Sequence, residues 1–204
     1  MLSIYQKDAA TITISGSRFI AVIFPLFNKN DISRYLEEVE KEYPKATHYC
    51  YAYRFEKEEY SYDDGEPSHS AGLPILNALK SEELEECLLV VTRYFGGTKL
   101  GLPRLTKAYK DISKDVASKA IKATLCQGKK VHLSVDYSSF EYIKRLSSKN
   151  GFDISLPLFD TKVTFFCIGS DNIIMPLLEK LQKEEILSIE DTVIRRRLDY
   201  DSCK

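Results

Sequence analysis

Two short segments of the chain concentrate the residue types that bind or transform ligands. The first segment, DDGEPSHSAG, begins at Asp63 and contains three carboxylates. Asp63, Asp64 and Glu66 could hold Mg²⁺ against a phosphate, because carboxylate oxygens suit that cation. They could equally cap a helix that begins near Ser70, where the helix dipole favours negative charge. The sequence leaves open whether a metal binds here.

The same loop places a hydroxyl and an imidazole side by side, in Ser68 and His69. Neighbouring side chains rarely face each other, and a catalytic triad is defined by a geometry that a sequence does not display. We therefore expect His69 to be a loop residue or a phosphate contact, and no catalytic residue is assigned.

The second segment, RYFGGTKLG, is expected to lead from a buried strand into a helix. Gly96 and Gly97 end the strand, so backbone N–H groups can gather where the helix dipole favours an anion. Arg93, Thr98 and Lys99 add positive charge and a hydroxyl donor. This arrangement favours binding of a phosphate group, either of a nucleotide or of a nucleic-acid backbone.

The helix beyond this segment continues the positive charge. Residues 93–122 contain eight Lys or Arg and two Asp, in a chain whose net charge is −1. The alternative interpretation is a glycine turn followed by the solvated face of an amphipathic helix. The predicted phosphate-binding residues are Arg93, Gly96, Gly97, Thr98, Lys99, Arg104 and Lys107.

Periodic patterns supply the elements that must position these segments in the first half of the chain. Two alternating runs predict paired strands around Ser15-Gly16. Apolar residues at helical spacing predict a helix with Asp31 as its N-cap and Pro44 as its stop. The predicted elements are strands 11–15 and 18–24, helix 31–43, strand 46–55, an acidic loop 56–66, helix 71–80, strand 87–95 and a long helix from 102 to about 125.

The second half begins after a short linker at Gln127-Gly128. Its predicted elements are strand 131–136, helix 138–150, strands 154–158 and 162–168, helix 172–183 and strand 186–196. This order is typical of the ferredoxin-like βαββαβ fold. The sequence therefore predicts an α+β protein of two domains, residues 1–127 and 128–204. Three arginines at 195–197 form either a further basic patch or charges that protect an edge strand.

Composition limits the classes of function. Lys and Arg number 29 and Asp and Glu 30 among 204 residues, which excludes a globally basic nucleic-acid binder but allows a local basic patch. The five cysteines are scattered without a CxxC spacing, which favours reduced thiols over zinc or disulfides. No signal-peptide pattern and no apolar run of about 20 residues is evident, so we expect a cytoplasmic protein with no membrane partner.

Four segments resemble the IMPACT/YigZ family in their order and spacing. They are SRFIA from Ser17, ATHYCYAY from Ala46, DDGEP from Asp63 and RYFGGTKLG from Arg93. The resemblance covers most of residues 1–125. It implies an N-terminal α/β two-layer domain of the fold shared by a small-subunit ribosomal protein and the GHMP kinases. The second half is similar to the bacterial YigZ-type arrangement, whose ferredoxin-like domain resembles the last domain of elongation factor G.

The resemblance also implies a role in translation. Eukaryotic relatives regulate translation through a protein partner that activates a stress kinase, and bacterial relatives look like nucleic-acid or ribosome binders. The family brings no catalytic residue set, and we expect no cofactor. Our leading hypothesis is RNA or ribosome binding without catalysis. The alternatives are a Mg²⁺-dependent enzyme acting on a nucleotide or phosphorylated substrate, and a protein-binding adaptor in the stress control of translation.

The chain departs from the family pattern at two places. It reads SHSAG from Ser68 where the family usually has SGTAG, and Pro103-Arg104 where the family has a glycine pair. Proline removes a backbone donor and arginine fills space, although proline suits the first turn of a helix. These changes weaken a backbone cradle for an anion and favour binding by the charges of Arg104 and Lys107.

Overall fold

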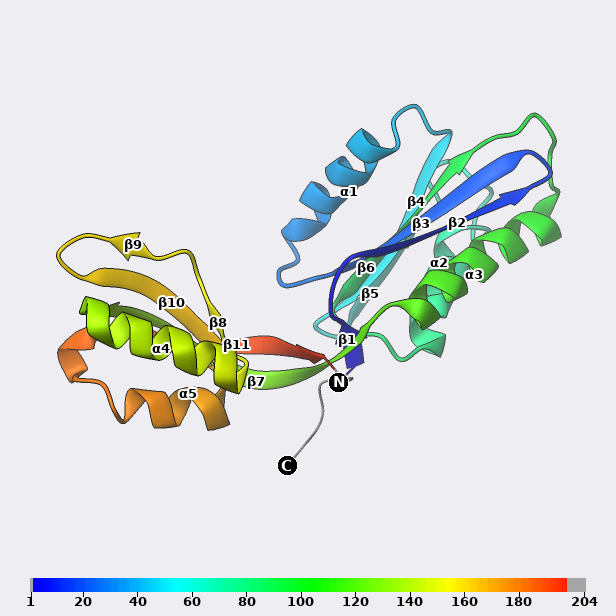
Figure 1. The fold of residues 1–204 in the computed structure, drawn as a ribbon. Coiled ribbons are helices and arrows are strands. Elements are labelled where there is room, and N and C mark those ends of the chain that lie inside the picture. The colour runs from blue at the N-terminus through cyan, green and yellow to red at the C-terminus, as the bar shows by residue number, and fades with distance from the viewer. Residues whose placement is uncertain (1, 198–204) are drawn as a thin grey trace. The chain divides into compact units, whose positions relative to one another are not determined.

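The structure is a computed structural model that describes residues 2–197 and their side chains up to Ile194. It consists of two compact units, one built on Met1–Thr124 and the other on Leu125–Arg196 (Figure 1). Both units contain helices and strands, so the predicted α+β class is confirmed.

The first unit is organised around a five-stranded antiparallel sheet. Its strand order is β2-β3-β6-β4-β5. The predicted hairpin around Ser15-Gly16 is confirmed, because Ile14 pairs with Ser17 across that turn. The strands are β2 (Asp8–Ile14), β3 (Ser17–Pro25), β4 (His48–Phe55), β5 (Glu58–Tyr62) and β6 (Cys87–Tyr94).

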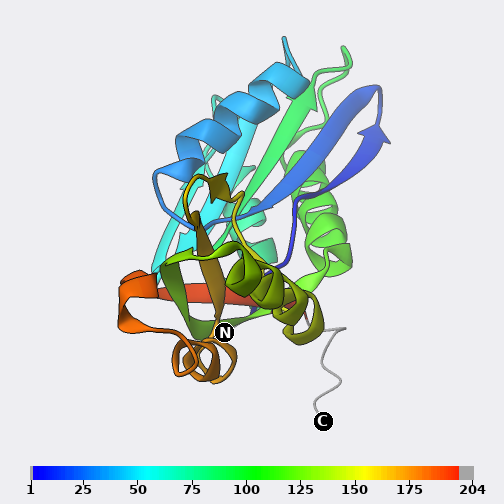
Figure 2. The ribbon, with the colours of Figure 1, turned by 60° about the vertical axis from the view of Figure 1, so that its left-hand side comes forward.

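Helices cover both faces of this sheet (Figures 1 and 2). On β3, Ile20 belongs to the core under α1 (Asp31–Glu42). Its neighbour Phe19 faces the core under α2 (Gly72–Ser81) and α3 (Leu102–Lys119). The sequence predicted two layers, and these correspond to the sheet and the helices α2 and α3. The helix α1 forms a third layer on the other face of the sheet. Burial on both faces explains why β3 and β6 are almost continuously apolar.

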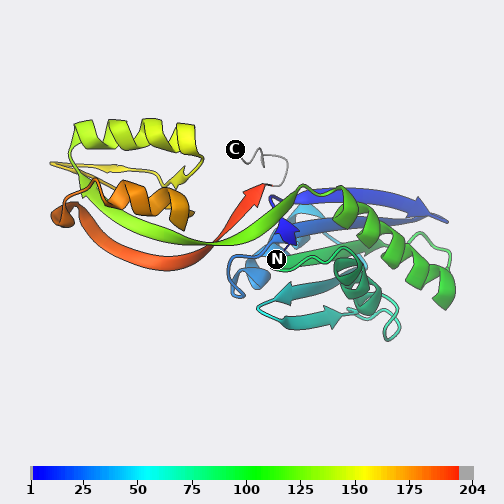
Figure 3. The ribbon, with the colours of Figure 1, turned by 90° about the horizontal axis from the view of Figure 1, so that it is seen from below.

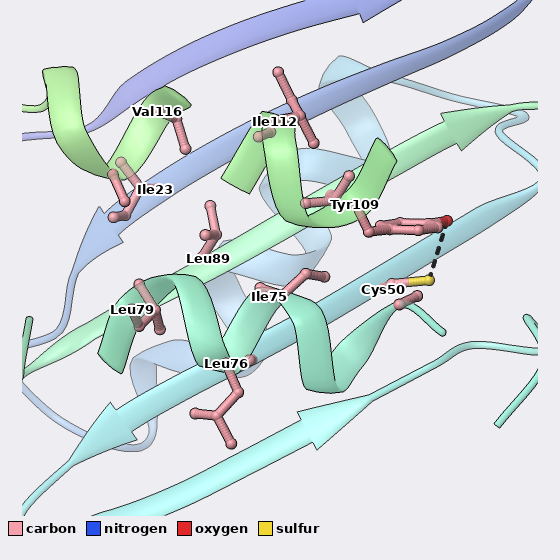
Figure 4. Close-up of a cluster of buried hydrophobic side chains, with 14 of the residues drawn as sticks. Ile23, Cys50, Ile75, Leu76, Leu79, Leu89, Tyr109, Ile112 and Val116 are labelled. Carbon is pink, nitrogen blue, oxygen red and sulfur yellow. Dashed lines mark hydrogen bonds between the residues drawn. The ribbon is translucent and has the colours of Figure 1, made fainter. Parts of the chain in front are cut away.

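The core beneath α2 and α3 is close-packed. Ile75 and Leu79 of α2 meet Tyr109 and Ile112 of α3 over the sheet (Figure 4). Tyr109 is fully buried, and its hydroxyl accepts a hydrogen bond from the Cys50 thiol at 3.5 Å. The apolar residues of α3 therefore form the face that packs against α2 and the sheet.

Several elements and boundaries in the first unit differ from the predictions. The acidic loop contains β5, because Tyr60 and Tyr62 pair with tyrosines of β4. Asn30, and not Asp31, is the N-cap of α1. Helix α3 ends at Lys119, and the strand β7 (Lys122–Val135) begins three residues later. A short strand, β1 (Leu2–Ile4), pairs with the beginning of β7 and was not predicted.

The predicted linker at Gln127-Gly128 lies inside β7. A Cβ at Gly128 would stand 2.5 Å from the carbonyl oxygen of Gly169. The glycine therefore permits close approach of two paired strands and does not mark a flexible connection.

The second unit has the strand order β11-β7-β10-β8. This is the order of a ferredoxin-like sheet, and Figure 3 shows both helices on the same side of β7 and β11. The predicted strand 154–158 is instead two short strands separated by residues 155–157, and the last helix ends at Leu178. The elements are α4 (Tyr137–Asn150), β8 (Asp153–Ile154), β9 (Leu158–Phe159), β10 (Val163–Ser170), α5 (Asp171–Leu178), the 3₁₀ turn η1 (Lys183–Glu185) and β11 (Ile186–Arg197).

Candidate nucleic-acid interface

A buried ion pair joins the two segments that the sequence singles out. Arg93 Nη1 lies 2.6 Å from Glu66 Oε1, and the two side chains are only 6% and 4% exposed. The loop after β5 and the end of β6 therefore converge. They do so inside the protein, so neither charge of the pair is available to a ligand in solution.

Other polar groups complete this cluster. The Tyr109 hydroxyl donates to Glu66 Oε1 at 2.8 Å, and Arg93 Nη2 donates to Ser17 Oγ at 3.5 Å. Burial raises the pKa of the Tyr109 phenol, and nearby Cys50 and Glu66 raise it further. Burial likewise raises the pKa of the Cys50 thiol. Both groups are therefore protonated and act as hydrogen-bond donors, not as nucleophiles.

His48 borders the cluster from β4. Its Nδ1 lies 2.7 Å from the carbonyl oxygen of Asp64, and its Nε2 lies 3.9 Å from Glu66 Oε1. The Nδ1 contact with a carbonyl oxygen requires a proton on Nδ1, which fixes the tautomer of the neutral ring. His48 was predicted only as a strand residue, and the structure brings it to the junction of the two segments.

Asp63 organises the loop that precedes α2. Its carboxylate accepts hydrogen bonds from the backbone N–H groups of His69, Ala71 and Gly72 at 2.8–3.0 Å. Burial opposes ionisation of this carboxyl, but the N–H donors outweigh it and hold the pKa of Asp63 below its ordinary value. The capping interpretation of this residue is therefore the one that the geometry supports.

The remaining loop residues also have places in the structure. Asp64 accepts a hydrogen bond from the backbone N–H of Tyr49 at 2.6 Å. Ser68 and His69 are exposed, and His69 has a positive φ of 61°. Within residues 2–194, no three His, Cys, Asp or Glu side chains are grouped so that they could hold a metal ion. The carboxylates proposed as Mg²⁺ ligands are instead hydrogen-bonded within the protein.

The two glycines after β6 have different structural roles. A Cβ on Gly96 would lie 1.9 Å from the carbonyl carbon of Gly16, so this glycine allows the β2–β3 turn to pack against it. Gly97 has a φ of +86°, and a Cβ there would meet nothing within 4 Å. The backbone at Gly96 is thus occupied by another turn, whereas Gly97 borders open space.

The predicted phosphate-binding residues after Gly97 are exposed. Thr98, Lys99, Arg104 and Lys107 all lie on the surface, although Lys107 forms an exposed ion pair with Asp111 at 2.5 Å. Pro103 stands in the first turn of α3, as predicted. These residues remain accessible to an anion, in contrast to Arg93.

Two lysines that the sequence analysis did not single out extend this surface. Lys110 and Lys114 are exposed on α3, and neither has a carboxylate partner among residues 2–194. Lys107, Lys110 and Lys114 follow the i, i+3, i+7 spacing that puts side chains on one helical face. The buried residues of α3 fall on the opposite face of the helix. The spacing of the lysines was therefore a sequence signal that could have identified Lys110 and Lys114 as surface cations.

The remaining predictions concern the C-terminal arginines, the cysteines and membrane-spanning helices. The side chains of the arginines at 195–197 and the whole of Cys203 are outside the described residues. The cysteines at 50 and 167 are free thiols. None of the helices in residues 2–197 is both long and apolar enough to cross a membrane.

Comparison with known proteins matches this chain to one family at the level of the domain and of individual relatives. The Impact N-terminal domain matches residues 15–117. IMPACT family member YvyE of Bacillus subtilis is 40% identical over 101 residues, which cover 48% of this chain and 46% of the relative. An IMPACT family member of Haemophilus influenzae is 32% identical over 147 residues, which cover 69% of this chain and 71% of the relative. The match thus spans about half of the first relative and more than two thirds of the second.

A solved structure is similar along most of the chain. It is described as a crystal structure of a hypothetical protein, and it covers 95% of this chain and 96% of its own. The TM-score is 0.58 at 23% sequence identity. A similarity at this level of identity concerns the fold alone.

Proposed function

Because this chain belongs to the IMPACT family, we propose that it regulates translation by binding RNA through exposed cations at and before α3. We call Lys99, Arg104, Lys110 and Lys114 the α3 cations. Each is exposed, and none has a carboxylate partner among residues 2–194. This set of unpaired cations on one helix and its leading loop is the observation that carries the proposal.

The chemistry of the α3 cations suits a nucleic-acid backbone. Lys and Arg side chains neutralise phosphates and release counterions, which makes affinity fall steeply with salt. Such contacts fix the position of a nucleic acid but carry little sequence information. The function in translation comes from the family resemblance, and the α3 cations supply the contact with RNA.

The carboxylates argue against the Mg²⁺-dependent enzyme. Glu66 is buried against Arg93, and Asp63 accepts three backbone hydrogen bonds. Coordination of a cation by these groups would break contacts that hold the loop in place. No contact among the described residues favours this second function.

The test is the salt dependence of RNA affinity. Fluorescence anisotropy with a labelled RNA should give a slope of log Kd against log salt that reports the phosphates contacted. The variant Arg104→Gln/Lys110→Gln/Lys114→Gln should lower that slope by roughly one per cation removed, or about three. A matched control, Arg34→Gln/Lys41→Gln/Lys144→Gln, removes three exposed charges from α1 and α4.

Equal loss of affinity in both triple variants would show that net charge alone drives binding, which contradicts a site on α3. Absence of RNA binding by the unaltered protein at 50 mM salt would reject the proposal outright. Partners that survive nuclease treatment in a pull-down would then favour the protein-binding adaptor.

A further inference from the structure

One aromatic ring stands exposed in the loop that carries Lys99 and leads into α3. Phe95 follows β6 directly and is 45% exposed. Single exposed apolar side chains are ordinary on protein surfaces, so the surroundings decide what this ring can do. Its backbone is fixed, because its N–H donates to Thr47 Oγ1 at 3.0 Å.

A buried cation supports the ring. The Arg93 guanidinium carbon lies 5.5 Å from the centroid of Phe95 and 5.4 Å from that of Phe19. Glu66 holds the same guanidinium at 2.6 Å. Since the cation is anchored by a buried carboxylate, the ring above it has a fixed support and presents its remaining surface to solvent.

The chain beside the ring leaves room for a ligand. A Cβ at Gly97 would meet nothing within 4 Å, and the same is true of Gly101. Lys99 lies between these glycines, and Arg104 lies in the first turn of α3. An accessible aromatic ring and two cations without a carboxylate partner among residues 2–194 therefore lie within the ten residues 95–104.

We propose that this loop binds a single-stranded segment of RNA, with one unpaired base stacked on Phe95 and adjoining phosphates on Lys99 and Arg104. The inference rests on the proposed function and adds the class of nucleic acid that the site prefers. Stacking on a protein ring needs a base that is free of its neighbours, which a continuous duplex does not offer. Every base has a ring face, so the preference is for strandedness and not for sequence.

The experiment compares two labelled probes at 50 mM salt, an oligouridylate dodecamer and a 12-base-pair RNA duplex. Phe95→Leu keeps an apolar side chain but removes the aromatic face. It should weaken binding of the dodecamer by about 5- to 100-fold and leave duplex binding within about twofold. The salt slope should stay unchanged, because no charge is lost. Phe95→Trp should retain or strengthen dodecamer binding.

A matched control is Phe159→Leu, which removes a 60% exposed ring from the second unit and should change neither affinity. Equal affinity of Phe95→Leu and the unaltered protein for the dodecamer would overturn the stacking inference while the proposed function stood. Equal weakening for both probes would overturn it as well. If the unaltered protein binds neither probe, the proposed function itself fails.

Discussion

Arg93 and Arg104 lie eleven residues apart, and the sequence predicts a phosphate contact for both. Arg93 is 5% exposed, and its guanidinium is held by Glu66 and contacts two phenylalanine rings. Arg104 stands on the surface without a carboxylate partner among the residues whose side chains are described. Two identical side chains in one segment therefore have opposite roles, one within the core and one toward solvent.

The same difference applies to the whole basic segment. Of its eight cations, four are paired with carboxylates, and four have no carboxylate partner among residues 2–194. The paired residues are Arg93 with Glu66, Lys107 with Asp111, Lys119 with Asp115 and Lys122 with Glu82. The acidic loop is compensated in a similar way, since Glu58 pairs with Lys29. Charge counted along a sequence thus overstates the charge that a ligand can meet.

The largest expected effect comes from breaking the buried pair. Glu66→Ala leaves the Arg93 charge buried without its partner, which should lower the free energy of unfolding by about 3–5 kcal/mol. Urea denaturation followed by circular dichroism measures this change. Replacing both residues, as Arg93→Met/Glu66→Leu, should recover much of the loss. If Glu66→Ala lowered the free energy of unfolding by less than about 1 kcal/mol, the structural role of the pair would be contradicted.

The next effect compares neighbouring glycines. Gly96→Ala places a methyl group against the backbone of Gly16, so we expect a loss of about 2–3 kcal/mol from overpacking. Gly97→Ala enters open space and strains only its positive φ, which costs about 1 kcal/mol. Thermal unfolding of both variants checks the order. Equal melting temperatures would mean that the β2–β3 turn yields to the added methyl group.

A smaller effect tests the loop carboxylate. Asp63→Ala removes the acceptor for three backbone donors and should cost about 1–2 kcal/mol at pH 7, as for a lost helix cap. The pKa of Asp63 is lowered in the folded state, so its stabilisation is complete above about pH 4 and disappears as pH falls through the folded pKa. Denaturation curves of variant and unaltered protein should therefore converge in acid. A constant difference from pH 7 to pH 2 would contradict this account.

The smallest effect belongs to the exposed pair on α3. Lys107→Ala breaks a contact between side chains that are 72% and 47% exposed, so stability should fall by no more than about 0.5 kcal/mol. The same urea titration used for Glu66→Ala makes the comparison direct. If Lys107→Ala lowered stability as much as Glu66→Ala, the exposed pair and the buried pair would not differ as we expect.

Much of the fold could be predicted because its strands are strongly apolar. The runs that became β3 and β6 are buried on both faces, which makes their sequence signal continuous. The short strand β1 has no such signal, since it consists of three residues whose partner strand lies almost 120 residues away. The strand β5 was not recognised because three of its five residues are acidic or polar. Its two glutamates pair with distant lysines, Glu58 with Lys29 and Glu59 with Lys80.

The candidate site was less predictable, because pairing is a property of three dimensions. One signal did exist for Arg93: it alternates with Leu89 and Val91, and those residues face the core beneath α2 and α3. No sequence pattern indicated that Glu66 would be buried. A carboxylate in a glycine-containing loop gives no indication that it will fold inward onto a strand residue 27 positions away.

The pairing of β1 has a consequence for how the chain is completed during synthesis. Leu2–Ile4 are synthesised well before their strand partner, Lys122–Thr124, which is made after the whole of α3. Until then the backbone groups of β1 that face this partner must remain solvated, although Ile4 belongs to the core. A nascent chain halted before Lys122 would therefore carry an unfinished first unit, and its last-made segment would be the helix that bears the unpaired cations.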